Sequence, residues 1–302
     1  MNKHLISVVG PTAIGKTAMA IEIARHYNCE IISADSRQFF KEMSIGTAVP
    51  SEAELKAAKH HFIQNISVEE DYSVGDFERD AIEKLKEIYK QNNIAVMAGG
   101  SGLYVKAVTE GLDHFPEVDS KIREQLNEEL LENGIFGLQQ KLQELDPVYY
   151  SKVDKENPHR IIRALEVCLQ SGKPYSAFRN QQKTPRTFHP IFVGLTSDRE
   201  VIYDRINQRV DLMMKEGLLE EVKKLYPKRA LNALNTVGYK ELFQFLEGNF
   251  TLEEAVAEIK KNTRRFAKRQ LTWFRKQPEI KWFDYQTPAE EIMVYLESKT
   301  HG

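Results

Sequence analysis

The residues best suited to chemistry form a glycine-rich segment near the N-terminus, Gly10-Pro-Thr-Ala-Ile-Gly-Lys-Thr17. This segment fits the pattern G-x-x-x-x-G-K-[ST] of a phosphate-binding loop. In such a loop successive backbone N–H groups surround a phosphate chain, and the start of the following helix adds positive potential. We expect Lys16 to reach the terminal phosphate and the Thr17 hydroxyl to bind Mg²⁺. The segment therefore predicts a site for a phosphate chain and magnesium, and leaves open which group is transferred.

Two further positions carry side chains suited to catalysis. Asp35 follows the apolar segment Glu30–Ser33, and its carboxylate would serve as a general base or a magnesium ligand. An Asp-Ser pair is also a common turn-former or helix cap, so the sequence leaves both roles open. Ser101 lies in the turn Gly99-Gly-Ser-Gly102, which either contacts a ligand or only permits close packing.

The elements that must position these residues alternate along the chain. Four apolar runs have the character of strands, namely Leu5–Val9, Glu30–Ser33, Ile94–Ala98 and Ile191–Leu195. Helical spacing appears between them, at Thr17–Tyr27 and Asp76–Gln91. Such alternation predicts a parallel sheet covered on both faces, with the carboxyl ends of the strands at one edge. We therefore expect an α/β fold, a P-loop NTPase-like parallel sheet flanked by helices.

The alternation is interrupted between Pro116 and Pro190, where the pattern is helical. This predicts a core of residues 1–115 and 190–302 and an all-helical inserted subdomain at 116–189; extra helices packed on the sheet are the alternative. The expected helices are Lys121–Leu131, capped by Asp119 or Ser120, and Arg160–Gln170, capped by Asn157 with Pro158 at its first position and Gly172 after its end. Ser197–Glu200 matches a capping box, and the chain beyond it is expected to be mostly helical.

Composition excludes several classes of protein. The 302 residues are 41% hydrophobic and 28% charged, with a formal net charge of −2, which is ordinary for a globular protein. The two cysteines, Cys29 and Cys168, lack partners at metal-ligand spacing, which argues against a disulfide framework or a zinc module. We find neither a signal peptide nor an apolar run long enough for a bilayer, so we expect no membrane association and a cytoplasmic location.

A basic segment near the C-terminus suggests a polyanionic partner. Lys260–Lys276 contains eight Lys or Arg and no acidic residue. On a helical wheel the cations share a broad face, and Phe266, Trp273 and Phe274 fall on the other. A solvated face is the alternative, but such faces normally mix both signs of charge. His60-His61 lacks further ligands at metal spacing, so we expect a structural or substrate-shaping role for it.

Taken in order, these motifs resemble the bacterial tRNA dimethylallyltransferases. The matching segments are Gly10–Thr17, Asp35-Ser-Arg-Gln38, Met43–Ala48, His60-His61, Tyr72–Phe77, Gly99–Tyr104, Asn157–Arg160, Arg163–Val167, Ser171–Lys173, Val237–Tyr239 and Lys268–Arg275. The resemblance implies a phosphate-loop core and a helical insertion at 116–189 that engages the tRNA anticodon arm. It also implies transfer of a dimethylallyl group from dimethylallyl diphosphate to N6 of adenosine 37, giving N6-isopentenyladenosine and diphosphate.

The implied reaction assigns roles to the candidate residues. Asp35 would accept the proton of the adenine amine, and Ser101 would hold that amine or relay its proton. Lys16, Mg²⁺ on Thr17, and Arg205 or Arg209 would stabilise the departing diphosphate. The residues expected to bind the diphosphate are Gly10, Pro11, Thr12, Ala13, Ile14, Gly15, Lys16 and Thr17. The implied cofactor is Mg²⁺, the partners are tRNA and dimethylallyl diphosphate, and the expected state is a monomer.

The resemblance also implies a set of tRNA contacts. They are Asp35, Ser36, Arg37, Gln38, Ser101, Arg123, His159, Arg160, Ile161, Ile162, Arg163, Asn235, Thr236, Val237, Gly238, Tyr239, Lys240, Lys268, Arg269, Gln270, Trp273 and Arg275. Of these, Ser101 and Arg123 are expected to flank the reacting base. The sequence departs from the family at three places. Many members have Thr at the position of Ser101, and some have Arg at that of Lys240. Phe39-Phe40 replaces a more usual pair whose second residue is Tyr.

Four other functions compete with this interpretation. A small-molecule kinase would use the same loop with ATP, the usual ligand class of such loops, but would not need the basic segment. A GTPase is disfavoured because the chain lacks an N-K-x-D motif. An adenylate isopentenyltransferase would have little use for the insertion, and an RNA-binding protein without activity would leave Lys16, Thr17 and Asp35 unexplained.

Overall fold

The structure is a computed structural model and describes residues 2–179 and 185–300. The chain forms two compact units, one of Met1–Glu110 and Arg186–Gly302, the other of Gly111–Pro185. The sequence placed the insertion at 116–189, of which 180–184 lie outside the described residues. The boundaries differ because Phe115 stacks on Tyr175 of the inserted unit, with ring centroids 4.7 Å apart, whereas Arg186 donates to the Ala107 carbonyl of the core at 2.6 Å.

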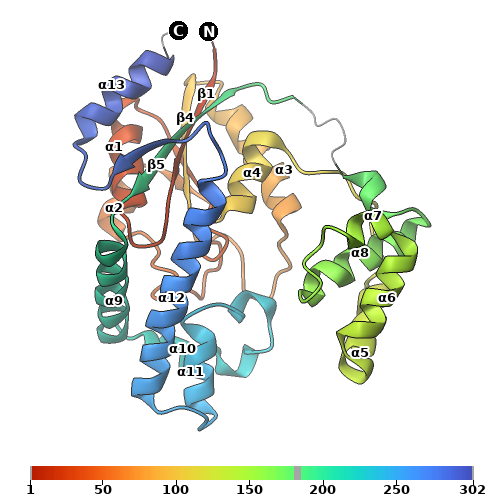
Figure 1. Ribbon diagram of the computed structural model, residues 1–302. Coiled ribbons are helices and arrows are strands. Elements are labelled where there is room, and N and C mark those ends of the chain that lie inside the picture. Colours follow the sequence, from red (N-terminus) through yellow and green to blue (C-terminus); the bar gives the residue numbers. More distant parts are fainter. Residues whose placement is uncertain (1, 180–184, 301–302) are drawn as a thin grey trace. The chain divides into compact units, whose positions relative to one another are not determined.

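Within the described residues, six parallel strands form one sheet (Figure 1). They are β1 (His4–Val9), β2 (Ile31–Ser33), β3 (His60–His61), β4 (Ile94–Gly99), β5 (His189–Thr196) and β6 (Lys281–Asp284), in the order β3-β2-β4-β1-β5-β6. The expected parallel α/β class is confirmed. The edge strands β3 and β6 were missed, because two and four residues are too few to show a period and their pairing with β2 and β5 fixes them.

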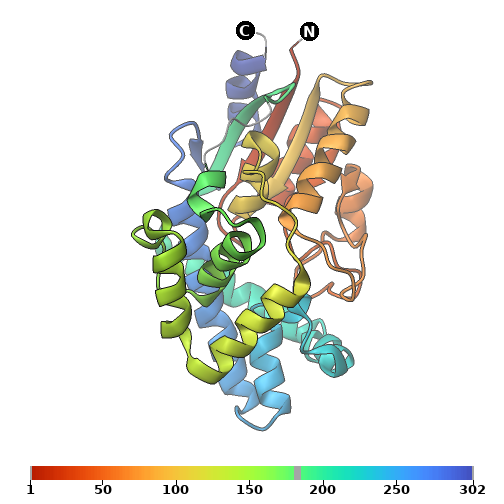
Figure 2. The ribbon, with the colours of Figure 1, turned by 90° about the vertical axis from the view of Figure 1, so that its right-hand side faces the viewer.

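The central strand β1 shows why both faces of the sheet are covered. Leu5 and Val9 lie in one hydrophobic cluster, Ile6 and Val8 lie in the other, and all four are fully buried. Because alternate side chains point to opposite faces, an uninterrupted apolar strand must be sandwiched between helices. Helices α1 (Lys16–His26) and α13 (Ala289–Thr300) contribute to the second cluster, and α3 (Val74–Ile88) and α4 (Gly102–Glu110) to the first (Figures 1 and 2).

Helix starts follow the local signals in most places. Gly15 precedes α1 with φ 109°, a left-handed conformation that favours glycine. Ser73 and Asp76 form a capping box at α3. The expected box at Ser197–Glu200 is wrong: Asp198 precedes α9 (Arg199–Lys215), and its side chain makes no capping hydrogen bond.

A helical layer from the C-terminal part of the chain extends beyond the sheet (Figure 1). After α9 it contains α10 (Leu218–Leu225), α11 (Tyr239–Leu246) and the long α12 (Leu252–Phe274), with short 3₁₀ turns at Tyr226–Lys228 and Asn232–Leu234; the short α2 (Glu52–Ala57) precedes β3. Helix α12 buries Ala255, Ile259, Ala267 and Phe274. None of the described helices has the length and apolar composition needed to cross a membrane.

The inserted unit is all-helical over its described residues. It contains α5 (Ser120–Asn133), α6 (Ile135–Leu145), α7 (Pro147–Tyr150), α8 (Pro158–Ser171) and a 3₁₀ turn at Tyr175–Phe178, around a core that includes Leu126, Leu138, Leu142, Ile161 and Leu165. The expected caps are confirmed. Asp119 accepts from Lys121 N at 3.0 Å, and Asn157 accepts from Arg160 N at 3.2 Å. Gly172 ends α8 at φ 64°.

Candidate active site

The loops that leave β1, β2 and β4 gather at the carboxyl edge of the sheet, as the alternation predicted. Their backbones approach so closely that side chains would not fit. A Cβ on Gly10 would lie 2.4 Å from the Leu195 carbonyl oxygen, and one on Gly99 would lie 2.4 Å from that of Ala34. The two glycines therefore let the phosphate loop, Asp35 and Ser101 share one edge.

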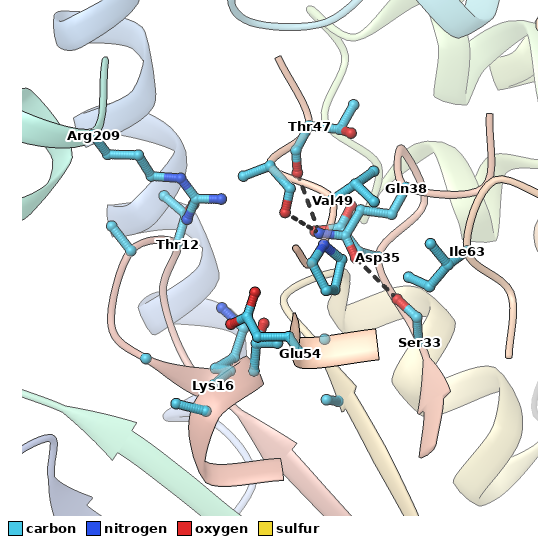
Figure 3. Close-up of a pocket in the computed structure, with 18 of the residues that line it drawn as sticks. Thr12, Lys16, Ser33, Asp35, Gln38, Thr47, Val49, Glu54, Ile63 and Arg209 are labelled. Carbon is cyan, nitrogen blue, oxygen red and sulfur yellow. Dashed lines mark hydrogen bonds between the residues drawn. The ribbon is translucent and has the colours of Figure 1, made fainter. Parts of the chain in front are cut away.

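A cavity of about 540 Å³ opens above the phosphate loop; we call it cavity one (Figure 3). The loop residues Thr12–Thr17, except Ile14, line it together with Asp35. Arg205 and Arg209 of α9 add positive charge. Its apolar lining includes Val49, Pro50, Ile63 and Leu212. Cavity one thus combines an anion-binding loop with an apolar wall, a combination suited to a short hydrocarbon chain that bears phosphates.

A second cavity of about 650 Å³, cavity two, adjoins the first. Its lining includes Ser36, Arg37, Ser101, Asn235, Thr236, Val237, Lys240, Arg269, Gln270 and Trp273, all expected tRNA contacts. Thr12, Asp35, Thr47 and Arg209 line both cavities. A ligand in each cavity would therefore meet the other beside the Asp35 carboxylate and the Arg209 guanidinium.

Lys16 is the cation most deeply placed in the phosphate loop. Its ammonium donates to the Pro11 carbonyl at 2.7 Å. Burial lowers the pKa of Lys16 to about 8; the negative charge of Asp35 opposes this shift, and the positive charge of Arg209 adds to it. An anion bound in the loop would favour the charged lysine and raise this pKa again.

The two arginines of α9 differ in what they contact. Arg205 donates from Nε to the Ala13 carbonyl at 2.8 Å, and its guanidinium lies 4.8 Å from the centre of the Tyr285 ring. It is therefore braced against the phosphate loop while still lining cavity one. Arg209 has no hydrogen-bond or ion-pair partner over 2–179 and 185–300, and Figure 3 shows its guanidinium extending toward Thr12. Burial lowers the pKa of Arg209, an effect that the carboxylates of Asp35 and Glu54 oppose.

Asp35 and Ser101 occupy the junction from two different loops. Asp35 Oδ1 accepts from the Arg37 backbone N–H at 3.1 Å, so Asp35 is a turn-former as well as a cavity side chain. Ser101 Oγ accepts from the Ser36 backbone N–H and donates to Ser36 Oγ, both at 3.2 Å. Because the turn at Asp35–Arg37 is bonded to Ser101, the carboxylate and the hydroxyl are held in a fixed relation.

Several expected tRNA contacts have partners inside the protein. Gln38 Nε2 donates to the carbonyls of Thr47, at 3.2 Å, and Ala48, at 2.9 Å (Figure 3). Tyr239 is fully buried with its hydroxyl on Glu221, and Gln270 is 6% exposed. Ile161 and Ile162 lie in the core of the inserted unit. These side chains position other groups.

The basic segment also differs from its helical-wheel interpretation. Phe266 and Trp273 are 38% and 39% exposed, whereas Phe274 is buried. Several of these cations have acidic or polar partners outside the segment. Lys260 pairs with Asp211 at 2.6 Å, Lys261 pairs with Glu258, and Arg264 donates to Asn207 at 2.7 Å. The wheel was wrong because α9 packs along α12 and takes up part of the expected basic face. Lys268, Arg269 and Arg275 remain exposed.

In the inserted unit, Arg123 and Arg163 converge on one buried carboxylate. Arg123 pairs through two nitrogens with Glu166, which is 1% exposed, and Arg163 Nη1 donates to the same group at 3.2 Å. The guanidinium of Arg163 also lies 5.5 Å from the centre of the Phe115 ring. Both arginines are thus held in place with much of their surface accessible, and His159 and Arg160 are exposed nearby on α8.

The donor groups of cavity one fit a magnesium ion that arrives with phosphates. Thr17 and the carboxylates of Asp35 and Glu54 line it. Over the described part of the chain, no group of three or more His, Cys, Asp or Glu could hold a metal by itself. Mg²⁺ commonly keeps waters and binds through one or two protein ligands plus substrate phosphates, which matches this donor set.

Some residues of the site gave little or no signal in the sequence. Thr47, Glu54, Gln208 and Leu212 line cavity one, and Phe266 lines cavity two. They lie on loops and helices far from the phosphate loop in sequence. The match at Met43–Ala48 included Thr47, and Phe266 lies in the basic segment; nothing in the sequence pointed to Glu54, Gln208 or Leu212.

The chain is similar in sequence to known proteins over almost its whole length. The chain matches the family model described as IPP transferase over residues 38–277. It is 64% identical to a tRNA dimethylallyltransferase of Christiangramia forsetii, with 99% of each chain covered. It is 57% identical to a tRNA dimethylallyltransferase of Flavobacterium johnsoniae, with 97% of each covered.

The fold is also similar to solved structures of transferases. The fold matches that of a tRNA isopentenylpyrophosphate transferase from Bacillus halodurans with a TM-score of 0.74 and 37% identity, covering 99% of this chain and 97% of the other. It also matches a eukaryotic dimethylallyltransferase described as acting on tRNA, with a TM-score of 0.82 and 25% identity, covering 99% and 80%.

Proposed function

The chain belongs to the IPP transferase family, and we propose that it transfers the dimethylallyl group of dimethylallyl diphosphate to N6 of adenosine 37 in tRNA. Transfer of a dimethylallyl group to tRNA follows from the family. The donor, the acceptor atom and the residue roles are the finer part of the proposal. The observation that carries it is the junction of the two cavities at Asp35 and Arg209, because a transferase must bring two substrates together at its reacting groups.

In this proposal the diphosphate lies in the phosphate loop, and the dimethylallyl chain lies against Val49, Pro50 and Ile63 in cavity one. The target adenine leaves its stack and enters cavity two, at an expected cost of a few kcal/mol. Its amine forms a C–N bond to the terminal carbon of the dimethylallyl group as the C–O bond to diphosphate breaks. The electron pair goes to the diphosphate, and the amine proton goes to Asp35.

Charge on the departing diphosphate is stabilised by Lys16, the backbone N–H groups of the loop and the unpaired guanidinium of Arg209. Arg205 acts indirectly, by bracing the loop at Ala13. Thr17, with Glu54, would hold a diphosphate-bound Mg²⁺, which supplies further charge neutralisation when bound. Ser101 orients the adenine amine from cavity two.

The tRNA is held by exposed cations on two parts of the chain. Lys268 and Arg269 of α12 and Arg275 just after it contact phosphates, and the inserted unit engages the anticodon arm through Arg123 and the α8 segment His159–Arg163. We propose that the protein acts as a monomer. A tRNA substrate implies a cytoplasmic location.

The test is transfer of label from radioactive dimethylallyl diphosphate to unmodified tRNA, with AMP and ATP as parallel acceptors and with and without a magnesium chelator. We expect label in adenosine 37 of tRNA only, lost on chelation and in a Lys16→Met variant. Label in free nucleotides would move the protein to the adenylate isopentenyltransferases. Absence of transfer together with ATP turnover would favour a kinase.

A further inference from the structure

We infer that Gln270 is a positioning residue that holds the donor and acceptor loops in register for transfer; this inference rests on the proposed function. The family resemblance implied that Gln270 contacts tRNA. Its side chain borders cavity two but is only 6% exposed. Both ends of its amide are engaged by backbone groups of the two catalytic loops.

The first contact is with the phosphate loop. Thr12 donates its backbone N–H to Gln270 Oε1 at 2.9 Å, across 258 positions of sequence. Thr12 is one of the residues that line both cavities, so this hydrogen bond acts where the two substrates would meet. A backbone N–H in a part-buried loop that loses its acceptor must find water or rearrange.

The second contact is with the turn that carries Ser101. Gln270 Nε2 donates to the Gly100 carbonyl at 3.0 Å. A Cβ at Gly100 would lie 2.2 Å from Gln270 Nε2, so the amide fills the space that the glycine leaves. The next residue, Ser101, is bonded to the turn of Asp35 through Ser36. One amide therefore links the phosphate loop to the Ser101–Asp35 pair.

This link fixes the distance between the reacting groups. It contributes little to the affinity for either substrate. The diphosphate is held by other backbone groups of the loop, and tRNA is held by exposed cations. Catalysis of a two-substrate reaction depends steeply on alignment, and a misplacement of about 1 Å costs up to about 100-fold in rate. Loss of the Gln270 amide should therefore lower kcat and leave binding nearly intact.

The test is a Gln270→Met variant, which keeps the length and volume of the side chain and removes both hydrogen bonds. Gln91→Leu, at an exposed position after α3, is a control for loss of a glutamine amide. We expect kcat to fall by about 10–100-fold in Gln270→Met, with the KM for dimethylallyl diphosphate and the Kd for tRNA changed by less than about 3-fold. Thermal unfolding would verify that the variant is folded at the assay temperature.

A Gln270→Glu variant gives a signature that a purely structural role would not produce. Its carboxylate still accepts from Thr12 N–H but has no donor for the Gly100 carbonyl, whereas the protonated carboxyl regains that donor. The ratio of variant to wild-type kcat should therefore rise as the pH falls. A ratio independent of pH would count against the assigned link to Gly100.

Other outcomes separate the inference from the proposed function. A normal kcat in Gln270→Met overturns the inference, and so does a loss caused entirely by weaker tRNA binding, which would make Gln270 a tRNA contact. If the wild-type protein transfers no label, the proposed function fails. Amide hydrogen exchange at Thr12 then still tests the link, because it should accelerate at least about 10-fold in Gln270→Met and not in Gln91→Leu.

Discussion

Glu221 accepts a hydrogen bond from the Tyr239 hydroxyl at 2.6 Å. The same carboxylate also accepts the backbone N–H groups of Ser44, Ile45 and Gly46, at 2.8 to 3.0 Å. These residues start the loop whose continuation, Thr47–Pro50, lines cavity one. Gly46 is required because a Cβ there would lie 2.5 Å from the Tyr239 ring. The helical layer thus holds one wall of the site from behind.

A Glu221→Gln substitution should loosen this wall. Each carboxylate oxygen accepts two donors, so an amide must turn its NH₂ toward N–H or O–H groups. We expect a loss of about 2–3 kcal/mol in the free energy of unfolding, since hydrogen bonds to a charged group are involved. The KM for dimethylallyl diphosphate should rise more than the Kd for tRNA. Denaturant unfolding and steady-state kinetics check this, with the exposed neighbour in Glu220→Gln as a control; equal effects of both variants would contradict it.

Asp35 should be required for chemistry and dispensable for tRNA binding. Asp35→Asn keeps an oxygen for the Arg37 N–H and removes the base. We expect turnover to fall by about 10²–10⁴-fold, the range for a lost general base, while the Kd for tRNA stays within a few-fold. Single-turnover kinetics and filter binding measure the two effects separately. Near-normal turnover would remove Asp35 as the proton acceptor.

Substitutions of the two arginines of α9 should change different kinetic parameters. Arg209 faces both cavities without a partner among the described residues, so Arg209→Gln should lower kcat by about 10²–10³-fold, as for loss of a group that stabilises transition-state charge. Arg205→Gln should act mainly through the phosphate loop and raise the KM for dimethylallyl diphosphate. Steady-state kinetics with both substrates varied distinguishes them, and the reverse assignment would follow if the two patterns were exchanged.

Binding of diphosphate should depend on pH through Lys16. Its pKa of about 8 lies below the ordinary value because the ammonium is desolvated, so Lys16 in the free site loses its charge as the pH rises through 8. A bound anion favours the charged form, and binding should therefore take up a proton between about pH 8 and 10. Calorimetry of magnesium diphosphate in buffers of different ionisation enthalpy measures this uptake. Lys16→Met should abolish it, and proton release in the wild-type protein would refute the assignment.

The exposed cations at the end of α12 should dominate the salt dependence of tRNA binding. Removal of one phosphate contact lowers the slope of log K against log salt concentration by about 0.7–0.9. We expect Lys268→Gln with Arg275→Gln to lower the slope by about 1.5, and Arg264→Gln, whose side chain lies against Asn207 and Tyr203, to lower it much less. A larger effect of Arg264→Gln would restore the helical-wheel interpretation.

Local signals in the sequence were sufficient for four of the six described strands and for several helices and their caps. The strands β1, β2, β4 and β5, the caps at Asp119 and Asn157 and the glycine end of α8 all depend on residues within a few positions of one another. The edge strands and the ion pairs of the basic segment could not be predicted from such local signals. They depend on neighbours brought alongside by folding, as with Lys260 and Asp211.

The sequence by itself determined the parallel α/β core, the phosphate loop and the edge of the sheet at which Asp35 and Ser101 lie, because periodicity and turn chemistry are short-range. Only the tertiary structure decided how the site is held together. It brought Gln270, Glu221 and Arg205 into hydrogen bonds with the backbone of Thr12, Gly46 and Ala13, respectively. Arg209 stayed unpaired over the described residues. These contacts join segments 258, 175 and 192 positions apart. A hydrogen bond of that range leaves no periodic trace in the sequence, since its geometry exists only once the helical layer has packed against the loops.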